Sequence, residues 1–208
     1  PGSIEMAAEL INQSVKPLML VGQGVELAGA RQELLALCEK AQIPFGQTML
    51  GLSAAPTGHP LNMGMLGMHG NLAPNVMTNQ CDLLIAVGMR FDDRVTGDLH
   101  TYAKQAKVIH FEIDPSEVGK IVKPTVAVLG NCKQTLAQVT ELVEPARHQA
   151  WIDGFKPYAE KEYNKVIEAA LNPKDGPLLM GEVVRRVSEA ANNEAIMVTD
   201  VGQNQLFG

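Results

Sequence analysis

The residues best suited to chemistry in this chain are glycines, arginines and a carboxylate that follow runs of apolar residues. Gly22-Gln23-Gly24 follows one such run, residues 88–94 follow a second, Glu112 ends a third, and Gly130-Asn131 follows a fourth. Backbone N–H groups beside glycines bind phosphate, arginines hold pyrophosphate by paired hydrogen bonds, and an acidic strand end accepts ribose hydroxyls. The pattern predicts a site for a nucleotide-type cofactor.

Each of these signals also has a structural interpretation. Glycines at 22 and 24 are typical of an ordinary tight turn, and Leu27 occupies the place of the third glycine of the dinucleotide fingerprint. The charged run at 90–94 is also typical of a solvated surface, and Glu112 of a polar strand end. Because all four segments are expected at one edge of one sheet, binding is the favoured interpretation.

A stretch rich in glycine and methionine, residues 51–70, is predicted to be a loop. His69 lies in it with no second histidine or carboxylate at ligand spacing, so no metal site is expected. The methionines could fill a core, but glycines at every third place from 64 to 70 favour a flexible loop that lines a flat ring. No serine or cysteine nucleophile motif and no paired catalytic carboxylates occur, and the other histidines, His110 among them, receive no role.

Composition narrows the class of protein. The 208 residues are 46% hydrophobic and 19% charged, with a net charge of −6 and no basic cluster. A folded core is therefore expected, and binding to nucleic acid or to an anionic membrane is not. No apolar run reaches the roughly 18 residues of a membrane helix. Three cysteines without a C-x-x-C pair indicate free thiols in a reducing cytoplasm.

Hydrophobic periodicity supplies the elements that must position these residues. Fully apolar runs predict buried strands, and they alternate with amphipathic helical patterns. The expected strands are 17–21, a weaker one within 43–49, 82–88, 107–113 and 125–129; the expected helices are 4–15, 28–41, 72–79 and 131–142, the last with Asn131 as its N-cap. This order predicts an α/β protein: a Rossmann-like three-layer α/β/α domain with a parallel sheet.

The same reading divides the chain into three parts. Residues 1–145 are expected to form the central α/β domain, and 146–177 a linker with a helix that ends in a Pro- and Gly-rich turn. Residues 178–208 are expected to be the truncated start of a following domain, with a helix at 178–191 and a strand at 195–198. Both ends of the chain are interpreted as cuts within a longer polypeptide.

Three segments carry a resemblance to a known family. MLGMHG at 65–70, GMRFDDRV at 88–95 and HFEIDP at 110–115 resemble, in this order and spacing, the central domain of the acetohydroxyacid synthase (acetolactate synthase) catalytic subunit. TDVGQNQ at 199–205 is similar to the start of that family's thiamine-diphosphate pyrophosphate domain. The similarity extends over essentially the whole chain.

The resemblance implies a function. The family condenses two pyruvates, or pyruvate and 2-oxobutyrate, with loss of carbon dioxide, in branched-chain amino acid synthesis. Thiamine diphosphate and magnesium carry the chemistry, and FAD lies on the central domain without being reduced or oxidised in the main reaction. The family forms dimers and tetramers, and the resemblance leaves open whether a regulatory subunit is used.

The resemblance also assigns cofactor-binding residues, grouped by the part of the cofactor that each would meet. The residues for FAD are Gly22, Gln23 and Gly24 for its ribityl and phosphate part, Thr48, Met49, Leu66, Gly67, Met68 and His69 for its ring, Gly88, Arg90, Asp92, Arg94 and Val95 along its length, and Glu112, Ile113, Gly130 and Asn131 for its adenosine end. The residues for the diphosphate of thiamine diphosphate are Val201, Gly202 and Gln203.

Some positions depart from the family, and some of its parts are not in this chain. The family often has aspartate where this chain has Asn131 and histidine where it has Asn204. Its activating glutamate lies in an N-terminal domain and its magnesium ligands lie beyond Gly208, so the fragment alone is expected to be inactive, with no catalytic residue and no metal ligand. Two other functions stay open: another thiamine-diphosphate carboligase or decarboxylase, such as glyoxylate carboligase, and a non-catalytic nucleotide-binding module.

Overall fold

The computed structural model describes residues 2–202 and Gln205. The chain forms two compact units, Pro1–Lys156 and Pro157–Gly208. The larger unit contains all the strands of the described residues and all the segments expected to bind FAD.

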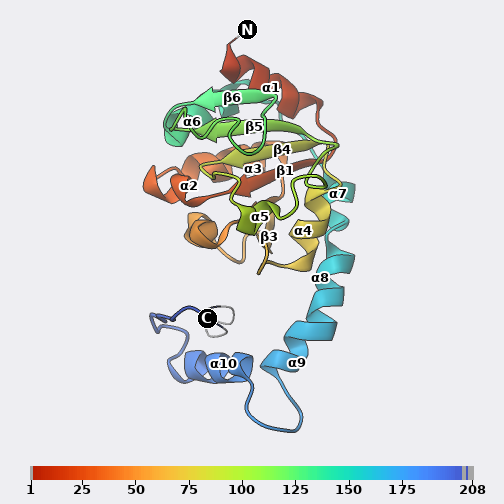
Figure 1. Ribbon diagram of the computed structural model, residues 1–208, viewed down its shortest axis with the longest axis vertical. Helices are drawn as coiled ribbons and strands as arrows, with labels where there is room; N and C mark the ends of the chain where they lie inside the picture. The colour runs from red at the N-terminus through yellow and green to blue at the C-terminus, as the bar shows by residue number, and fades with distance from the viewer. Residues whose placement is uncertain (1, 203–204, 206–208) are drawn as a thin grey trace. The chain divides into compact units, whose positions relative to one another are not determined.

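The larger unit is built on a six-stranded sheet (Figure 1). The strands are β1 (Pro17–Val21), β2 (Phe45–Gln47), β3 (Asn62–Met65), β4 (Leu83–Val87), β5 (Lys107–Glu112) and β6 (Val126–Leu129). Their order is β3-β2-β1-β4-β5-β6, and every neighbouring pair is parallel. This is the order of a doubly wound nucleotide-binding sheet, which confirms the predicted fold class.

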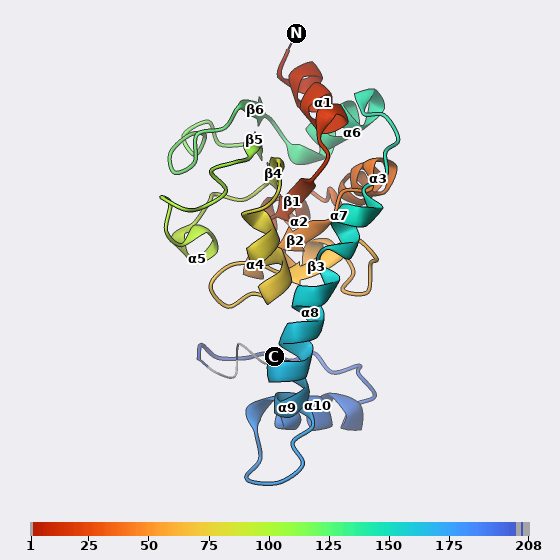
Figure 2. The same cartoon turned by 90° about the vertical axis from the view of Figure 1, so that its right-hand side faces the viewer.

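Helices cover both faces of this sheet (Figure 2). On one face lie α1 (Ser3–Gln13), α3 (Arg31–Ala41) and α6 (Cys132–Leu142), and on the other lie α4 (Leu72–Thr78) and α5 (Asp93–Thr96). Every residue of β1 and β4 is buried, as expected for strands covered on both sides. No helix among the described residues has the length and apolar character needed to cross a membrane.

The predicted loop at 51–70 is wrong in part, because it contains β3 and a 3-10 turn, η1 (Met49–Ala54). β3 is a half-buried edge strand whose sequence, Asn-Met-Gly-Met, has no β-branched residue and does not alternate. Its pairing with β2 shifts register, and Gly64 has a φ of +97°. An irregular edge strand of this kind leaves no periodic signal in the sequence.

The sheet unit extends beyond residue 145. Helix α7 (Gln149–Asp153) places Trp151 in the unit, where its indole N–H donates to the Pro17 carbonyl at 2.8 Å. Phe155 packs edge-on against Trp151 with ring centroids 5.4 Å apart, and both side chains are buried. These aromatic residues account for the boundary at Lys156, eleven residues later than the sequence pattern suggested.

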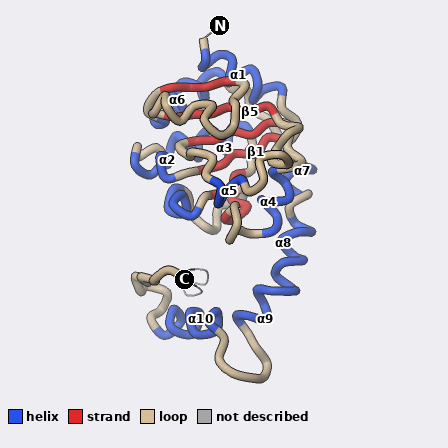
Figure 3. The backbone as a smooth tube through the Cα atoms, viewed as in Figure 1, coloured by secondary structure: helices blue, strands red, loops and turns tan. Residues whose placement is uncertain are grey.

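The smaller unit is helical. It contains most of α8 (Lys156–Glu162), a π-helical turn η2 (Tyr163–Ile167), α9 (Glu168–Leu171) and α10 (Met180–Ala190), which matches the helix expected at 178–191. The strand expected at 195–198 is wrong, because this segment is a loop (Figure 3). Ile196 is 93% exposed and Val198 89% exposed. A strand needs a partner for its backbone groups, and none lies beside this segment among the described residues.

Candidate cofactor-binding site

A cleft opens at the carboxyl ends of β1 and β4, where the order of the sheet reverses. The chain leaves β1 toward β2 on one side and leaves β4 toward β5 on the other, so the two strand ends diverge and leave a crevice. The cleft has a volume of about 710 Å³, within the usual range of ligand pockets. It is lined by Gly22, Gln23, Gly24, Leu27, Ala28, Thr48, Met49, Leu50, Gly88, Met89, Arg90, Asp92, Arg94, Val95, Phe111, Glu112, Ile113, Gly130, Asn131 and Cys132.

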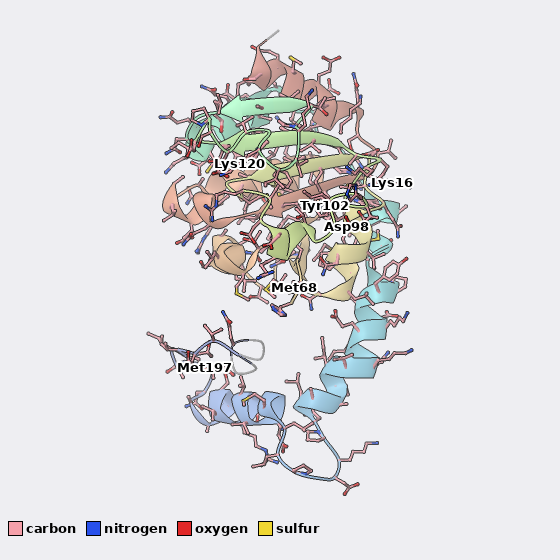
Figure 4. All side chains as sticks on the ribbon, viewed as in Figure 1. Lys16, Met68, Asp98, Tyr102, Lys120 and Met197 are labelled. Carbon is pink, nitrogen blue, oxygen red and sulfur yellow. The ribbon has the colours of Figure 1, made fainter. Side chains whose placement is uncertain are left out.

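Most residues that sequence reasoning assigned to FAD therefore line one cleft. Residues labelled in Figure 4 mark the two edges of the sheet. Lys120 follows β5 and lies at the carboxyl edge of the sheet, where the cleft is, whereas Lys16 precedes β1 and lies at the opposite edge. Tyr102 lies toward the Lys16 edge, and its N–H donates to the Asp98 carbonyl at 3.1 Å. The loop after α5 thus returns the chain to the edge where β5 begins, away from the cleft.

The floor of the cleft is a crossing of two glycine-containing turns. A Cβ atom on Gly22 would lie 2.2 Å from the Gly88 carbonyl oxygen, and one on Gly24 would lie 2.7 Å from the Gly88 Cα. Gly22 N–H donates to the Val87 carbonyl at 2.9 Å, and Gly24 N–H donates to the Gly88 carbonyl at 3.0 Å. These two N–H groups are occupied by protein, so the glycines serve the cleft by letting the backbones meet rather than by donating to a phosphate.

The charged run after β4 has one buried anchor and two exposed cations. The side chain of Phe91 is buried, and its backbone has a left-handed conformation with a φ of +55°. Arg90 is exposed, and its side chain makes no hydrogen bond or ion pair with any described residue. The exposed guanidinium group of Arg94 pairs only with its neighbour Asp93 among the described residues, at 3.3 Å between Nη1 and Oδ2. Two guanidinium groups are thus available to an anion at the cleft.

Asp92 has a structural role in this run. Its carboxylate caps α5 by accepting from Arg94 N–H at 2.9 Å. This backbone hydrogen bond, together with the nearby arginine charges, lowers the pKa of Asp92 below its usual value. The predicted cofactor residue thus also fixes the turn that carries both arginines.

Glu112 ends β5 with one of its oxygens unsatisfied. The side chain is 7% exposed, and Oε1 accepts from Ile113 N–H at 2.8 Å and from Asp114 N–H at 3.1 Å. Oε2 is buried without a hydrogen-bond partner, and Glu112 lines the cleft. A buried acceptor without a donor is costly, and a ligand hydroxyl would satisfy it.

The other end of the cleft is apolar. Met49 and Leu50 of η1 line it, and Leu27, from the short helical segment that packs beside η1, exposes a large side chain there. The buried amide of Gln47 holds η1 by donating to the carbonyls of residues 51 and 52 at 2.8 and 3.0 Å. Thr48 is fixed by its N–H, which donates to the Val21 carbonyl at 2.9 Å. An apolar end on a fixed turn suits a flat ring.

Four predicted residues, Leu66, Gly67, Met68 and His69, do not line the cleft. Leu66 is buried and Met68 is exposed, at the end of the unit where Figure 4 labels it. The segment supports the cleft indirectly, because Met68 N–H donates to the Arg94 carbonyl at 2.6 Å. The amide of Asn75 bonds both the N–H and the carbonyl of Gly67, at 2.9 and 2.8 Å.

The segment after β6 closes the remaining side. Gly130 N–H donates to the Glu112 carbonyl at 3.0 Å, and Asn131 caps α6 through a bond from Lys133 N–H at 2.9 Å, as predicted for that N-cap. Cys132 lines the cleft, where burial raises the pKa of its thiol to about 11. The thiol is therefore protonated at neutral pH and is a poor nucleophile.

The three residues expected to meet thiamine diphosphate lie outside this cleft. Val201 is in the smaller unit, 85% exposed, and its N–H donates to the Asp200 carboxylate at 2.7 Å. Gly202 follows it, and Gln203 lies outside the described residues. In the described part of the chain, no three histidine, cysteine, aspartate or glutamate side chains gather as a metal site.

Sequence reasoning missed two buried polar residues that shape the cleft, Gln47 and His110. Gln47 ends the fully buried strand β2, and His110 lies between buried apolar residues in the middle of β5. A polar residue beside buried apolar positions was the available signal, because a buried polar side chain must find a hydrogen-bond partner.

The sheet order and the cleft define the class of this protein: a doubly wound α/β domain of the nucleotide-binding type. More particularly, the chain belongs to the family described as thiamine pyrophosphate enzyme, central domain, which matches residues 4–139. The match runs from α1 into α6 and so covers the entire sheet.

Similar proteins carry one name. The chain is 38% identical, over its full length, to a probable acetolactate synthase large subunit of Methanocaldococcus jannaschii, and covers 36% of that protein. It is 41% identical over 99% of its length to the acetolactate synthase large subunit of Parasynechococcus marenigrum, and covers 33% of it. It is 38% identical over 99% of its length to the acetolactate synthase isozyme 1 large subunit of Escherichia coli, and covers 35% of it. The chain thus spans about a third of the length of these relatives.

Proposed function

We propose that this chain is the FAD-carrying central part of an acetolactate synthase large subunit, here called the parent polypeptide. Its reaction would join two pyruvates, or pyruvate and 2-oxobutyrate, with loss of carbon dioxide. The observation that carries the proposal is the cleft at the point where the strand order reverses. Arg90 and Arg94 line it after β4, and the unsatisfied carboxylate oxygen of Glu112 lies at the end of β5. The similarity to large subunits over the full chain supports it.

The residues present fit FAD. Arg90 and Arg94 supply the cations that a pyrophosphate needs, and their charges are not consumed by buried ion pairs. Glu112 Oε2 would accept a ribose hydroxyl and so gain the donor that it lacks. Met49 and Leu50 would lie against the flavin ring at the apolar end.

The residues at 66–69 have a more indirect part in the proposed FAD site. They lie outside the cleft lining but are bonded to its wall through the Arg94 carbonyl. Met68 is exposed and could reach a ring that extends past Arg94. We propose that His69 and its neighbours meet the flavin only at its far edge.

The smaller unit would contribute to a second site in the parent polypeptide. We propose that residues 178–208 begin the pyrophosphate domain and that Val201, Gly202 and Gln203 contact the diphosphate of thiamine diphosphate. Thiamine diphosphate with magnesium supplies the carbanion chemistry when bound, and the 2-oxo acid is its substrate. The side chains of Ile196 and Val198 are apolar and exposed, which supports the proposal that other parts of this domain cover them in the parent polypeptide.

Assembly and location complete the proposal. We propose a homo-oligomer, which the resemblance to the family implies, and a cytoplasmic location, which the three free thiols of this chain support. The relatives are named large subunits, which supports a smaller regulatory partner for the parent polypeptide.

The test is production of acetolactate from pyruvate by the parent polypeptide, supplied with thiamine diphosphate, magnesium and FAD. Acetolactate is expected, together with binding of FAD in a 1:1 ratio. A parent that condenses glyoxylate and makes no acetolactate would assign the chain to another carboligase of the same family. Failure to bind any flavin would remove the cofactor part of the proposal.

The isolated chain is expected to bind FAD weakly or not at all and to make no acetolactate. Binding must immobilise exposed side chains such as Arg90 and Met49, and flanking domains would hold them beforehand. Flavin fluorescence titration of the isolated chain checks this expectation. Tight stoichiometric binding would show that the cleft is complete in this chain alone.

A further inference from the structure

His110 lies in the middle of β5, fully buried, on the face of the sheet opposite the main hydrophobic core. Its partners in register on the two neighbouring strands are Ala86 of β4 and Ala127 of β6. These small side chains leave room for an imidazole ring between them. A polar ring in such a place needs a partner, and its partner lies in the charged run after β4.

The ring holds the start of that run. His110 Nε2 lies 2.8 Å from the Met89 carbonyl oxygen, and since a carbonyl only accepts, Nε2 carries the proton. Phe91 packs edge-on against the same ring, with centroids 5.1 Å apart. His110 therefore contacts the residue before Arg90 and the residue after it.

The same ring lies beside the unsatisfied carboxylate. His110 and Glu112 are two residues apart on one strand, so they share a face, and Nε2 is 3.6 Å from Glu112 Oε2. The single N–H of the nitrogen is committed to Met89, so Glu112 Oε2 and His110 Nδ1 both remain buried without a partner. Glu112 Oε2 is thereby left for a ligand.

We propose that His110 is a positioning residue that sets the spacing between the arginine-bearing run and Glu112, and so selects the dinucleotide FAD over the mononucleotide FMN. This inference rests on the proposed function. FAD spans both a pyrophosphate and an adenosine ribose, whereas FMN has one phosphate and no ribose. Only the dinucleotide can therefore use both groups whose separation His110 fixes.

Two substitutions of His110 separate the packing of its ring from its hydrogen bond to Met89. His110→Phe keeps a ring that packs on Phe91 but loses the donor to the Met89 carbonyl. His110→Gln replaces the ring by an amide whose N–H reaches about as far as Nε2 and restores the donor. His59→Phe is the matched control, because His59 also packs on a phenylalanine, Phe45, with centroids 5.6 Å apart, and lies outside the cleft.

The experiment titrates the flavin-free parent polypeptide with FAD and, separately, with FMN, following flavin fluorescence, with the melting temperature recorded for each variant. The unsubstituted protein is expected to bind FAD at least tenfold more tightly than FMN. His110→Phe should weaken FAD at least tenfold and change FMN less than threefold, His110→Gln should return FAD to within threefold, and His59→Phe should change neither.

Three results would overturn the inference. If His110→Phe lost affinity equally for FAD and FMN, the residue would be merely structural. If His110→Gln bound FAD as weakly as His110→Phe, the hydrogen bond to Met89 would not be what selects FAD. If His110→Phe does not fold, His110→Asn replaces it, because its shorter amide cannot reach Met89, and equal FAD binding by the Asn and Gln variants would count against the inference. An unsubstituted parent without FAD binding would refute the proposed function itself.

Discussion

Two sides of one cleft are built in opposite ways. On the β1 side, the floor is made of backbone, with Gly22 and Gly24 against Gly88 and their N–H groups bonded to protein carbonyls. On the side of the charged run, Arg90 and Arg94 are exposed and carry charges that no buried partner neutralises. The first side supplies shape and the second supplies charge.

This difference shows that substitutions at neighbouring positions of one binding site can reduce binding for different reasons. A substitution in the glycine crossing forces two backbones apart and costs folding free energy. A substitution of an exposed arginine leaves the fold unchanged and costs only affinity. The following experiments separate these two kinds of loss, from the largest expected effect to the smallest.

Gly22→Ala is expected to lower the free energy of unfolding by about 3 kcal/mol or more, because the new Cβ would lie 2.2 Å from a backbone oxygen that has no room to move. Chemical denaturation measures the change. Gly58→Ala is the control, since a Cβ there meets nothing within 4 Å, and it should change stability by less than about 0.5 kcal/mol. Equal effects of the two substitutions would show that the backbone at Gly22 has room for a Cβ atom beside the Gly88 carbonyl.

Arg90→Gln and Arg94→Gln are each expected to weaken FAD binding by the parent polypeptide about 10- to 100-fold, the loss of one charge-assisted hydrogen bond. The melting temperature of the flavin-free protein should not change, because both side chains are exposed. Flavin fluorescence titration and thermal unfolding report the two quantities. A fall in melting temperature without loss of affinity would reverse the contrast between the two sides.

Asp92→Ala is expected to cost about 1 kcal/mol of stability, because it removes the N-cap of α5. Asp92→Asn should retain most of this contribution, since the amide oxygen can also accept from Arg94 N–H. Urea denaturation of both variants tests the role of the cap. If Ala and Asn behave alike, the carboxylate acts through charge and not through the cap.

The smallest effect is a dependence of stability on pH. The pKa of Asp92 is lower in the folded chain than in the unfolded one, so its contribution is fully present above the unfolded value of about 3.9 and is lost as pH falls through the lower folded value. The difference in stability between the unsubstituted chain and Asp92→Asn should therefore shrink as pH falls below about 4. A difference that stays constant between pH 3 and pH 6 would contradict this account.

The sequence was sufficient for the regular parts of the sheet unit. β1 and β4 are unbroken apolar runs, and such runs favour a buried parallel strand when helices alternate with them. The residues that follow these strands could then be placed at one edge of the sheet without knowing any distance. That inference brought most of the predicted FAD residues into one cleft.

The remaining features depend on contacts between segments far apart in the chain. Whether Gly24 N–H meets a phosphate or the Gly88 carbonyl cannot be read from glycine spacing, because it depends on how two turns cross. Likewise, His110 acquires a role only through Met89, 21 residues earlier. The exposed run at 195–198 looked like a strand because its composition is apolar, but strands require partners that composition does not supply.

Hydrogen–deuterium exchange of the parent polypeptide, with and without saturating FAD, tests the central claim most directly. If the cleft at the sheet reversal holds the cofactor, amide protection should rise in the peptides that contain Gln23, Arg94 and Ile113, all of which line it. Peptides at the opposite edge of the sheet, around Lys16, should not change. Protection confined to regions outside the cleft, with FAD demonstrably bound, would contradict the account.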